Sequence, residues 1–376
     1  MGKIIIRSTT VSQSLGFFTP TNKALEERGY EVVLLSSPGK EMIEFREEGF
    51  RAIEVEMERH ISLSKDVRSL MNLIKVFRKE KPYLVHSMTP KAGMLCMLAA
   101  WLTQVPRRVH TFTGLIWPTA TGMKRRLLMT SDWLTCLCAT HVIPEGQGVM
   151  NDLQQHITNK QMRVLGLGNV RGVDMIRFSK RPKVVEKAKL IKKDGAFTFI
   201  FVGRIVGDKG INELVEAFVK LSKEMEKPRL LLVGNYEEKL DTLKPITLEN
   251  IRENTRIEAV GPQYGDDLLA YYAASNCFVF PSYREGFPNT VMEAGAMELP
   301  SIVTDINGSR EIVENGKNGV IIPPKDTGAL YDAMKKMIEA KDEYNTMAAN
   351  ARSMIESRFE QGYVRKCLLE FYDEIL

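Results

Sequence analysis

The sequence predicts an α/β protein of two tandem domains, each built on a parallel sheet with helices on both faces. The chain has 376 residues, which is more than one hydrophobic core of usual size needs. Short apolar runs of strand length alternate with helical periodicity in both halves, as in parallel sheets. A glycine-rich stretch at 166–174 separates the halves and has the composition of a hinge.

The first half, residues 1–172, predicts five strands and two helices. The strands are expected at 4–6, 31–35, 52–55, 84–86 and 108–112. A turn at 12–16 precedes a helix that carries Phe17, Phe18 and Leu25 on its apolar side and ends at Gly29. A second helix covers about 65–79.

The second half, residues 173–357, repeats this plan, so each half predicts a Rossmann-like domain. Strands are expected at 197–202, 230–233, 277–280 and 301–304, with helices from Gly210 and over 267–274 and 290–298. The last helices lie within 335–376, and the final one, about 358–376, is expected to join the first domain. Two such sheets would face a central cleft at their carboxyl ends, where open α/β sheets bind ligands.

Basic residues are concentrated in the first half of the chain. Residues 1–175 hold 23 Lys and Arg against 16 Asp and Glu, whereas the remainder holds 29 against 31. This imbalance suggests an anionic partner, either a phosphorylated acceptor or an anionic membrane, and a solvated surface without a partner explains it equally well. No motif for nucleic-acid binding is present.

Two apolar segments raise the question of membrane contact. Residues 92–105 are uncharged but too short to span a bilayer, and Lys124-Arg125-Arg126 precedes a run rich in Leu and Met. Both segments are also typical of buried core helices. The apolar run at the N-terminus is too short for a signal peptide, so a cytoplasmic protein is expected, with peripheral attachment to the inner membrane face as a hypothesis.

The five cysteines form no Cys-x-x-Cys pair, which disfavours zinc and redox roles.

The segment 203–210 predicts an anion site. It lies where a strand ends and a helix begins, so free backbone N–H groups converge with the cations of Arg204 and Lys209. Such a site would stabilise a diphosphate leaving group. The glycines at 166, 168 and 172 have the wrong spacing for a dinucleotide fingerprint, and no helix follows them.

A second site is predicted at residues 281–294. Glu285 follows a strand, and Glu293 lies on a helix that Thr290 is expected to cap. Gly286 would let the backbone approach a ligand closely, and the N–H groups of residues 287–290 would point at sugar or phosphate oxygens.

The string from Glu285 to Glu293 resembles the Glu-x₇-Glu motif of retaining glycosyltransferases of family 4, which have the GT-B fold. Gly203-Arg204 with Lys209-Gly210 resembles the phosphate motif of that family. Residues 14–16, 86–93 and 169–174 are similar to members that build capsular polysaccharide or O-antigen, so the resemblance covers nearly the whole chain.

The resemblance implies that a nucleotide-diphosphate sugar, with uridine favoured, donates a hexose or N-acetylhexosamine to a polysaccharide precursor. The expected acceptor is linked to a polyprenyl diphosphate. The first domain would bind the acceptor and the second the donor, with retention of configuration and without a metal or other cofactor. The implied donor-binding residues are Gly16, Arg204, Lys209, Glu285, Gly286, Phe287, Pro288, Asn289, Thr290 and Glu293.

The sequence departs from the family pattern at one position. Many relatives carry a histidine where this chain has Thr113, and His110 lies three residues earlier on the opposite strand face. Besides Glu285, the candidates for a catalytic role are therefore Thr113, His110 and His86, although each histidine has an equally good explanation as a structural residue.

Three rival functions remain open at this stage. A nucleotide-sugar 2-epimerase would have the same fold, and a protein without turnover would bind nucleotide sugars in the same place. A nicotinamide oxidoreductase is the third rival. The sequence does not identify the sugar, the linkage or the oligomeric state.

Overall fold

The chain folds into two compact units. A computed structural model describes residues 3–58, 62–237 and 241–376. The first unit comprises Met1–Arg171 together with Gly362–Leu376, and the second comprises Gly172–Gln361. The last helix is therefore part of the first unit, although it follows the second unit in the sequence.

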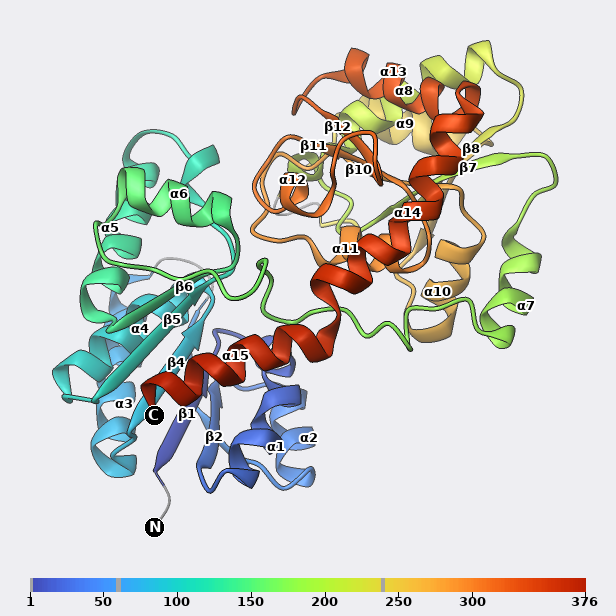
Figure 1. Cartoon of the computed structure of the whole chain (residues 1–376). Helices are drawn as coiled ribbons and strands as arrows, with labels where there is room; N and C mark the ends of the chain where they lie inside the picture. The colour runs from blue at the N-terminus through green and yellow to red at the C-terminus, as the bar shows by residue number, and fades with distance from the viewer. Residues whose placement is uncertain (1–2, 59–61, 238–240) are drawn as a thin grey trace. The chain divides into compact units, whose positions relative to one another are not determined.

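The first unit is a six-stranded parallel sheet with helices packed against it (Figure 1). Its strands are β1 (Ile4–Ser8), β2 (Glu31–Ser36), β3 (Arg51–Glu54), β4 (Leu84–Met88), β5 (Arg107–Phe112) and β6 (His141–Pro144). Its α-helices are α1 (Thr19–Glu27), α2 (Lys40–Glu47), α3 (Leu63–Glu80), α4 (Pro90–Leu102), α5 (Gly122–Cys138), α6 (Gln147–His156) and α15 (Gln361–Ile375), and its 3₁₀ turns are η1 (Ser12–Phe17) and η2 (Trp117–Thr119).

The second unit has the same construction. Its strands are β7 (Phe197–Val202), β8 (Pro228–Val233), β9 (Ile257–Gly261), β10 (Cys277–Phe280), β11 (Ser301–Thr304) and β12 (Gly319–Ile322). Its helices are α7 (Pro182–Ile191), α8 (Ile211–Glu224), α9 (Pro245–Glu253), α10 (Gly265–Ala273), α11 (Asn289–Ala296), α12 (Ser309–Ile312), α13 (Thr327–Glu339) and α14 (Lys341–Phe359), and the 3₁₀ turn η3 (Gly207–Lys209) precedes α8.

The two sheets have the same strand order. The first runs β3-β2-β1-β4-β5-β6 and the second β9-β8-β7-β10-β11-β12, and neighbouring strands are parallel in both. In each sheet the order reverses between the first and fourth strands of the unit. Ligands of such sheets bind outside the carboxyl ends of the strands at this reversal. The prediction of two tandem Rossmann-like domains is confirmed.

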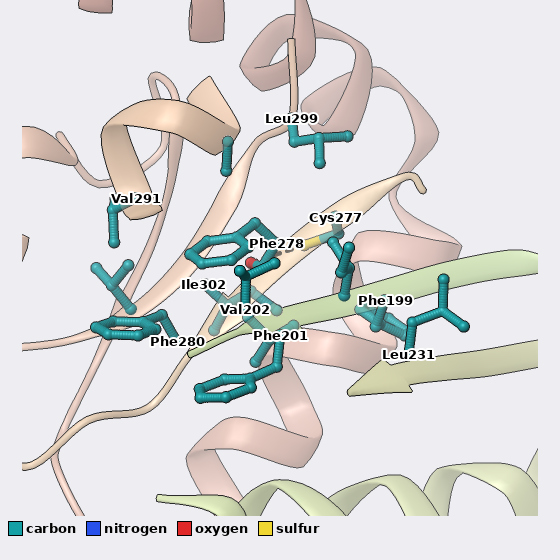
Figure 2. Close-up of a cluster of buried hydrophobic side chains, with 14 of the residues drawn as sticks. Phe199, Phe201, Val202, Leu231, Cys277, Phe278, Phe280, Val291, Leu299 and Ile302 are labelled. Atoms are coloured by element: carbon teal, nitrogen blue, oxygen red, sulfur yellow. Dashed lines mark hydrogen bonds between the residues drawn. The ribbon is translucent and has the colours of Figure 1, made fainter. Parts of the chain in front are cut away.

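The strands form because continuous runs of β-branched and aromatic residues are buried on both faces. Every residue of β4, β8, β10 and β11 is buried. Figure 2 shows the core of the second unit, where the Phe280 ring stacks between those of Phe201 and Phe278 at centroid separations of 5.8 Å. The predicted strands at 197–202, 277–280 and 301–304 have these bounds in the structure.

The first helix begins later than predicted. Phe17 ends the 3₁₀ turn η1 and Phe18 caps α1, which starts at Thr19. Pro20 explains the difference, since proline lacks an N–H group and is favoured in the first turn of a helix, where that group has no partner.

Helix α15 is anchored in the first unit by buried polar contacts. The hydroxyl of Tyr372 shares a 2.5 Å hydrogen bond with Nδ1 of His86, and the side chain of Arg107 donates to the carbonyl of Ile375 at 2.8 Å. The guanidinium of Arg7 is fully buried and lies 5.1 Å from the centroid of the Tyr372 ring. These contacts tie the end of the chain to β1, β4 and β5.

The apolar segment 92–105 is a core helix. Most of α4 is buried, and only its end exposes large apolar side chains, at Trp101 and Leu102. Among the helices that the structure describes, none combines the length and the apolar character needed to cross a bilayer.

Replacement of Gly234 by alanine tests the close packing at the carboxyl ends of β7 and β8. Gly234 has φ of +150°, and an added Cβ would lie 1.8 Å from the carbonyl oxygen of Gly203. We expect Gly234→Ala to lower the free energy of unfolding of the second unit by roughly 3 kcal/mol. Gly316→Ala is the control, because its φ is +77° but no atom lies within 4 Å. That variant should cost only about 1 kcal/mol.

All three tryptophans lie in the first unit, so urea denaturation is best followed by far-UV circular dichroism. Equal losses in the two variants would show that the backbone clash at Gly234 is relieved without cost.

Candidate functional site

The clearest site lies at the strand reversal of the second sheet, between the loops after β7 and β10. Gly210 ends η3 with φ of +72°, and an added Cβ would lie 2.0 Å from the carbonyl oxygen of Pro281. Only glycine permits this approach. The backbone N–H of Tyr283 also donates to the carbonyl of Asp208 at 2.9 Å, so the two loops are joined by direct backbone contact.

This contact brings together two of the predicted site residues. Nζ of Lys209 forms an ion pair with Oε1 of Glu285, and the side chains are 14% and 17% exposed. The hydroxyl of Ser282 donates to the same carboxylate oxygen at 2.7 Å. The structure thus places a largely enclosed cation and carboxylate side by side at the edge where a ligand is expected.

Arg204 lies in a more exposed position on the loop after β7. Its guanidinium pairs with Glu237 at 3.1 Å, and both side chains are more than a third exposed. Exposed pairs of this kind contribute little to stability, so this contact leaves Arg204 available to a ligand at small cost.

Helix α11 begins at Asn289, with Pro288 as its N-terminal cap. The prediction that Thr290 caps this helix is wrong, because Thr290 is already its second residue and a capping residue needs non-helical backbone angles. The N-terminus of a helix is the positive end of its dipole. This end follows directly on the loop that carries Glu285.

Phe287 and Gly286, in the same loop as Glu285, are both buried. The Phe287 side chain is buried, and its ring packs edge-on against Phe359 with centroids 5.3 Å apart. Gly286 is buried as well. Any contact of Phe287 with a ligand would therefore be made by its backbone, as predicted for the N–H groups of 287–290.

Glu293 lies on α11, half-buried, next to a buried phenol. Burial and, secondarily, the charge of Glu293 raise the pKa of Tyr272 well above its usual value. Tyr272 comes from α10, so Glu293 lies near α10.

One pair of residues at this site was missed by sequence reasoning. The hydroxyl of Tyr283 donates to Oε2 of Glu213 at 2.7 Å, and burial, followed by this carboxylate, raises the pKa of Tyr283. Glu213 lies in the first turn of α8 and Tyr283 in the loop after β10. Both types of residue are common on surfaces, and no local pattern marks them as partners.

In the first unit, the strand reversal between β1 and β4 carries neutral hydroxyls. The hydroxyls of Thr10 and Thr89 share a 2.7 Å hydrogen bond, and Thr89 has φ of +72°. Positive φ is unusual for a β-branched residue, and such strain is concentrated at functional sites. Gly16 is exposed in η1 after β1, and Thr113 is half-buried directly after β5.

The two histidines proposed for catalysis are enclosed. His86 is fully buried, and its ring nitrogens contact Tyr372 and Thr111. Burial and, secondarily, the charge of Arg7 hold the pKa of His86 well below its usual value.

His110 lies between the Ser87 hydroxyl, at 2.8 Å from its Nδ1, and the backbone of Gly93. Burial lowers the pKa of His110 to about 3. Both rings are buried and hydrogen-bonded, which fits the structural explanation of these residues, and their catalytic role stays a prediction.

Comparison with known proteins identifies the family. Residues 183–354 match the model of the group 1 glycosyl transferases, and residues 21–168 match the glycosyl transferase 4-like domain. The chain is 31% identical over 375 residues to the capsular polysaccharide biosynthesis glycosyltransferase CapM of Staphylococcus aureus. This alignment covers 99% of this chain and 97% of that protein.

Further similarity extends to a second enzyme and to solved structures. The chain is 27% identical to the Escherichia coli UDP-Gal:alpha-D-GlcNAc-diphosphoundecaprenol alpha-1,3-galactosyltransferase, over 89% of this chain and 87% of that one. The structure of Anabaena HepE in complex with UDP superposes with a TM-score of 0.80 at 17% identity, covering 99% of this chain and 100% of that one. With whole-length similarity to CapM and matches in both halves, the chain belongs to family 4 of the glycosyltransferases and has the GT-B fold.

Proposed function

We propose that this glycosyltransferase moves a hexose or N-acetylhexosamine from a UDP-sugar to a polysaccharide precursor linked to a polyprenyl diphosphate. The transfer would retain the anomeric configuration and require no metal. The observation that carries the proposal is the Lys209–Glu285 pair, supported by Ser282, at the strand reversal of the second unit. It combines a cation for a phosphate with a carboxylate for sugar hydroxyls.

Lys209 and Arg204 are proposed to bind the donor diphosphate. Negative charge develops on this group as the bond to the sugar breaks, and fixed positive groups lower the barrier by stabilising that charge. The positive end of the α11 dipole, at Asn289 and Thr290, would add to this stabilisation without a metal ion.

Glu285 is proposed to contact the transferred sugar and Glu293 the ribose. Ser282 occupies Oε1 of Glu285, which fixes the carboxylate and leaves Oε2 for a sugar hydroxyl. The name of the E. coli relative specifies UDP-galactose, and HepE was solved with UDP, which supports uridine in the donor.

The acceptor is proposed to bind the first unit. The E. coli relative is named for a diphosphoundecaprenol acceptor, and a Campylobacter jejuni relative, 23% identical, is also named for one. The excess of basic residues in the first half of this chain fits such an anionic lipid. Gly16 and Thr113, both accessible near strand ends, are the proposed contacts.

Thermal unfolding with a panel of nucleotides tests the donor assignment. UDP at 100 times its Kd should stabilise the native state by about 2.7 kcal/mol. This corresponds to a rise in Tm of roughly 5–10 °C for a unit of this size. ADP serves as the control for base preference, and a UDP-sugar that raises Tm further than UDP identifies the transferred sugar. No shift with any nucleotide would contradict the proposal.

Lys209→Ala should lower kcat/KM for sugar transfer by roughly 10²–10³-fold, because the developing charge on the diphosphate loses a fixed cation. Steady-state assays with a UDP-sugar measure this. Lys317→Ala makes the same change in charge at an exposed surface pair with Glu314 and should leave kcat/KM unchanged. Similar losses in the two variants would indicate that only net charge matters.

Glu285→Gln should separate binding from transfer. The substitution releases Lys209 from its carboxylate partner, so the affinity for UDP should stay equal or rise, while kcat falls roughly 100-fold. Calorimetry with UDP and turnover assays measure the two effects. Glu224→Gln, which changes a remote carboxylate paired with Lys335, should alter neither. If UDP binding and turnover fell together in Glu285→Gln, Glu285 would be a donor-binding residue rather than a contact of the sugar.

A further inference from the structure

An apolar groove in the first unit lies between α3, α4 and α5 and has no role in the donor site. Its volume is about 190 Å³, and its walls are apolar except for two hydroxyl residues and one ion pair. Met94 of α4 and Ile116, Leu127 and Leu134 are among the apolar lining residues. An aliphatic cavity of about 150 Å³ holds a molecule the size of benzene, so this groove has room for about one five-carbon branched unit.

The one charged pair in the wall is neutralised within the protein. Nζ of Lys91 lies 2.7 and 2.6 Å from the two carboxylate oxygens of Asp66, and both side chains are nearly buried. The groove therefore offers an apolar ligand a surface without an uncompensated charge.

Apolar surface continues outside the groove along α3. Leu63, Val67 and Met71 follow one another at a spacing of four residues, which places them on one face of the helix, and all three are more than half exposed. Leu63 also lines the groove. Contiguous exposed apolar surface of this kind marks interaction sites in soluble proteins.

Cations adjoin the groove at the start of α5. Lys124, Arg125 and Arg126 are exposed and directly precede the lining residues Leu127 and Leu128. Within the described part of the chain, none of the three forms an ion pair. The guanidinium of Arg125 lies over the Trp117 ring, 5.5 Å from its centroid, and Lys124 and Arg126 can bind an anionic group next to an apolar chain.

The groove also lies close to the edge of the sheet where ligands are expected. Its lining residue Pro90 follows the end of β4 by two residues, and Ile116 follows the end of β5 by four. Open α/β sheets bind their ligands at this carboxyl edge. A ligand that joins an apolar chain to an anionic group and a sugar would match the groove, the cations and the edge together.

We propose that this groove binds the first isoprenoid unit of a lipid diphosphate acceptor, with its diphosphate toward Lys124, Arg125 and Arg126. The inference rests on the proposed function, because the lipid would belong to the acceptor of that reaction. The groove, rather than the sugar alone, would then distinguish a lipid-linked acceptor from a free saccharide.

Equilibrium binding of geranylgeranyl diphosphate below its micelle concentration, compared with inorganic diphosphate, tests the groove without any transfer reaction. The wild-type protein should bind the lipid at least about tenfold more tightly than inorganic diphosphate. Leu127→Gln should lose about tenfold in affinity for the lipid and none for inorganic diphosphate. Leu137→Gln is the matched control, since Leu137 is a similarly exposed leucine on α5 that does not line the groove.

Equal affinity for the two ligands, or equal losses in the two glutamine variants, would overturn the proposal. Photocrosslinking of a benzophenone-bearing prenyl diphosphate to the wild-type protein gives a second measurement, with adducts expected on α3, α4 or α5 and adducts confined to other elements counting against the groove. If the lipid binds as expected but no sugar is transferred to a lipid-linked acceptor, the proposed function fails and the groove stands.

Discussion

The close approach of two loops at the strand reversal of the second sheet determines the geometry of the proposed donor site. Gly210 lies against the carbonyl of Pro281 so tightly that a Cβ would come within 2.0 Å of the oxygen. Lys209 directly precedes this contact and Glu285 follows it by four residues. With any larger residue at 210 the loops would separate, and the cation and carboxylate would no longer meet.

The two units use the same backbone plan for different chemistry. In both, the loops after the first and fourth strands touch at the strand reversal, through Thr10 and Thr89 in the first unit and through Asp208 and Tyr283 in the second. The first contact consists of neutral hydroxyls, whereas the second adjoins a charged pair. The repeated fold therefore explains why the same loop contact recurs at both sheet edges, and the side chains explain why a cation and a carboxylate adjoin it only in the second unit.

The fold was readable from the sequence because buried parallel strands are continuous runs of β-forming residues. The run Phe197–Val202 has the composition of a buried strand, and the structure has a strand with these bounds. What the sequence did not reveal were partnerships across long separations. Lys209 and Glu285 were each predicted to bind a ligand, yet their pairing depends on two loops 76 residues apart.

The wrong prediction of the cap of α11 has the same origin. Thr290 is a good capping residue by type, but α11 begins at Asn289, two residues earlier than a cap at Thr290 requires. His86 and His110 are suited to catalysis by type, but hydrogen bonds from neighbouring strands and α15 enclose them. Local residue preference cannot foresee which side chains the tertiary packing will cover.

The Lys209–Glu285 pair also affects the energy of the site. Both side chains are largely removed from water, so either alone would be an uncompensated charge costing several kcal/mol. Their pairing reduces that cost. Under the proposed function, a diphosphate replaces the carboxylate as the partner of Lys209, and Glu285, still held by Ser282, becomes free to accept from the sugar. The carboxylate would then be available to the sugar only when the phosphate is bound to Lys209. Recognition of the diphosphate and recognition of the sugar would therefore be coupled through this pair.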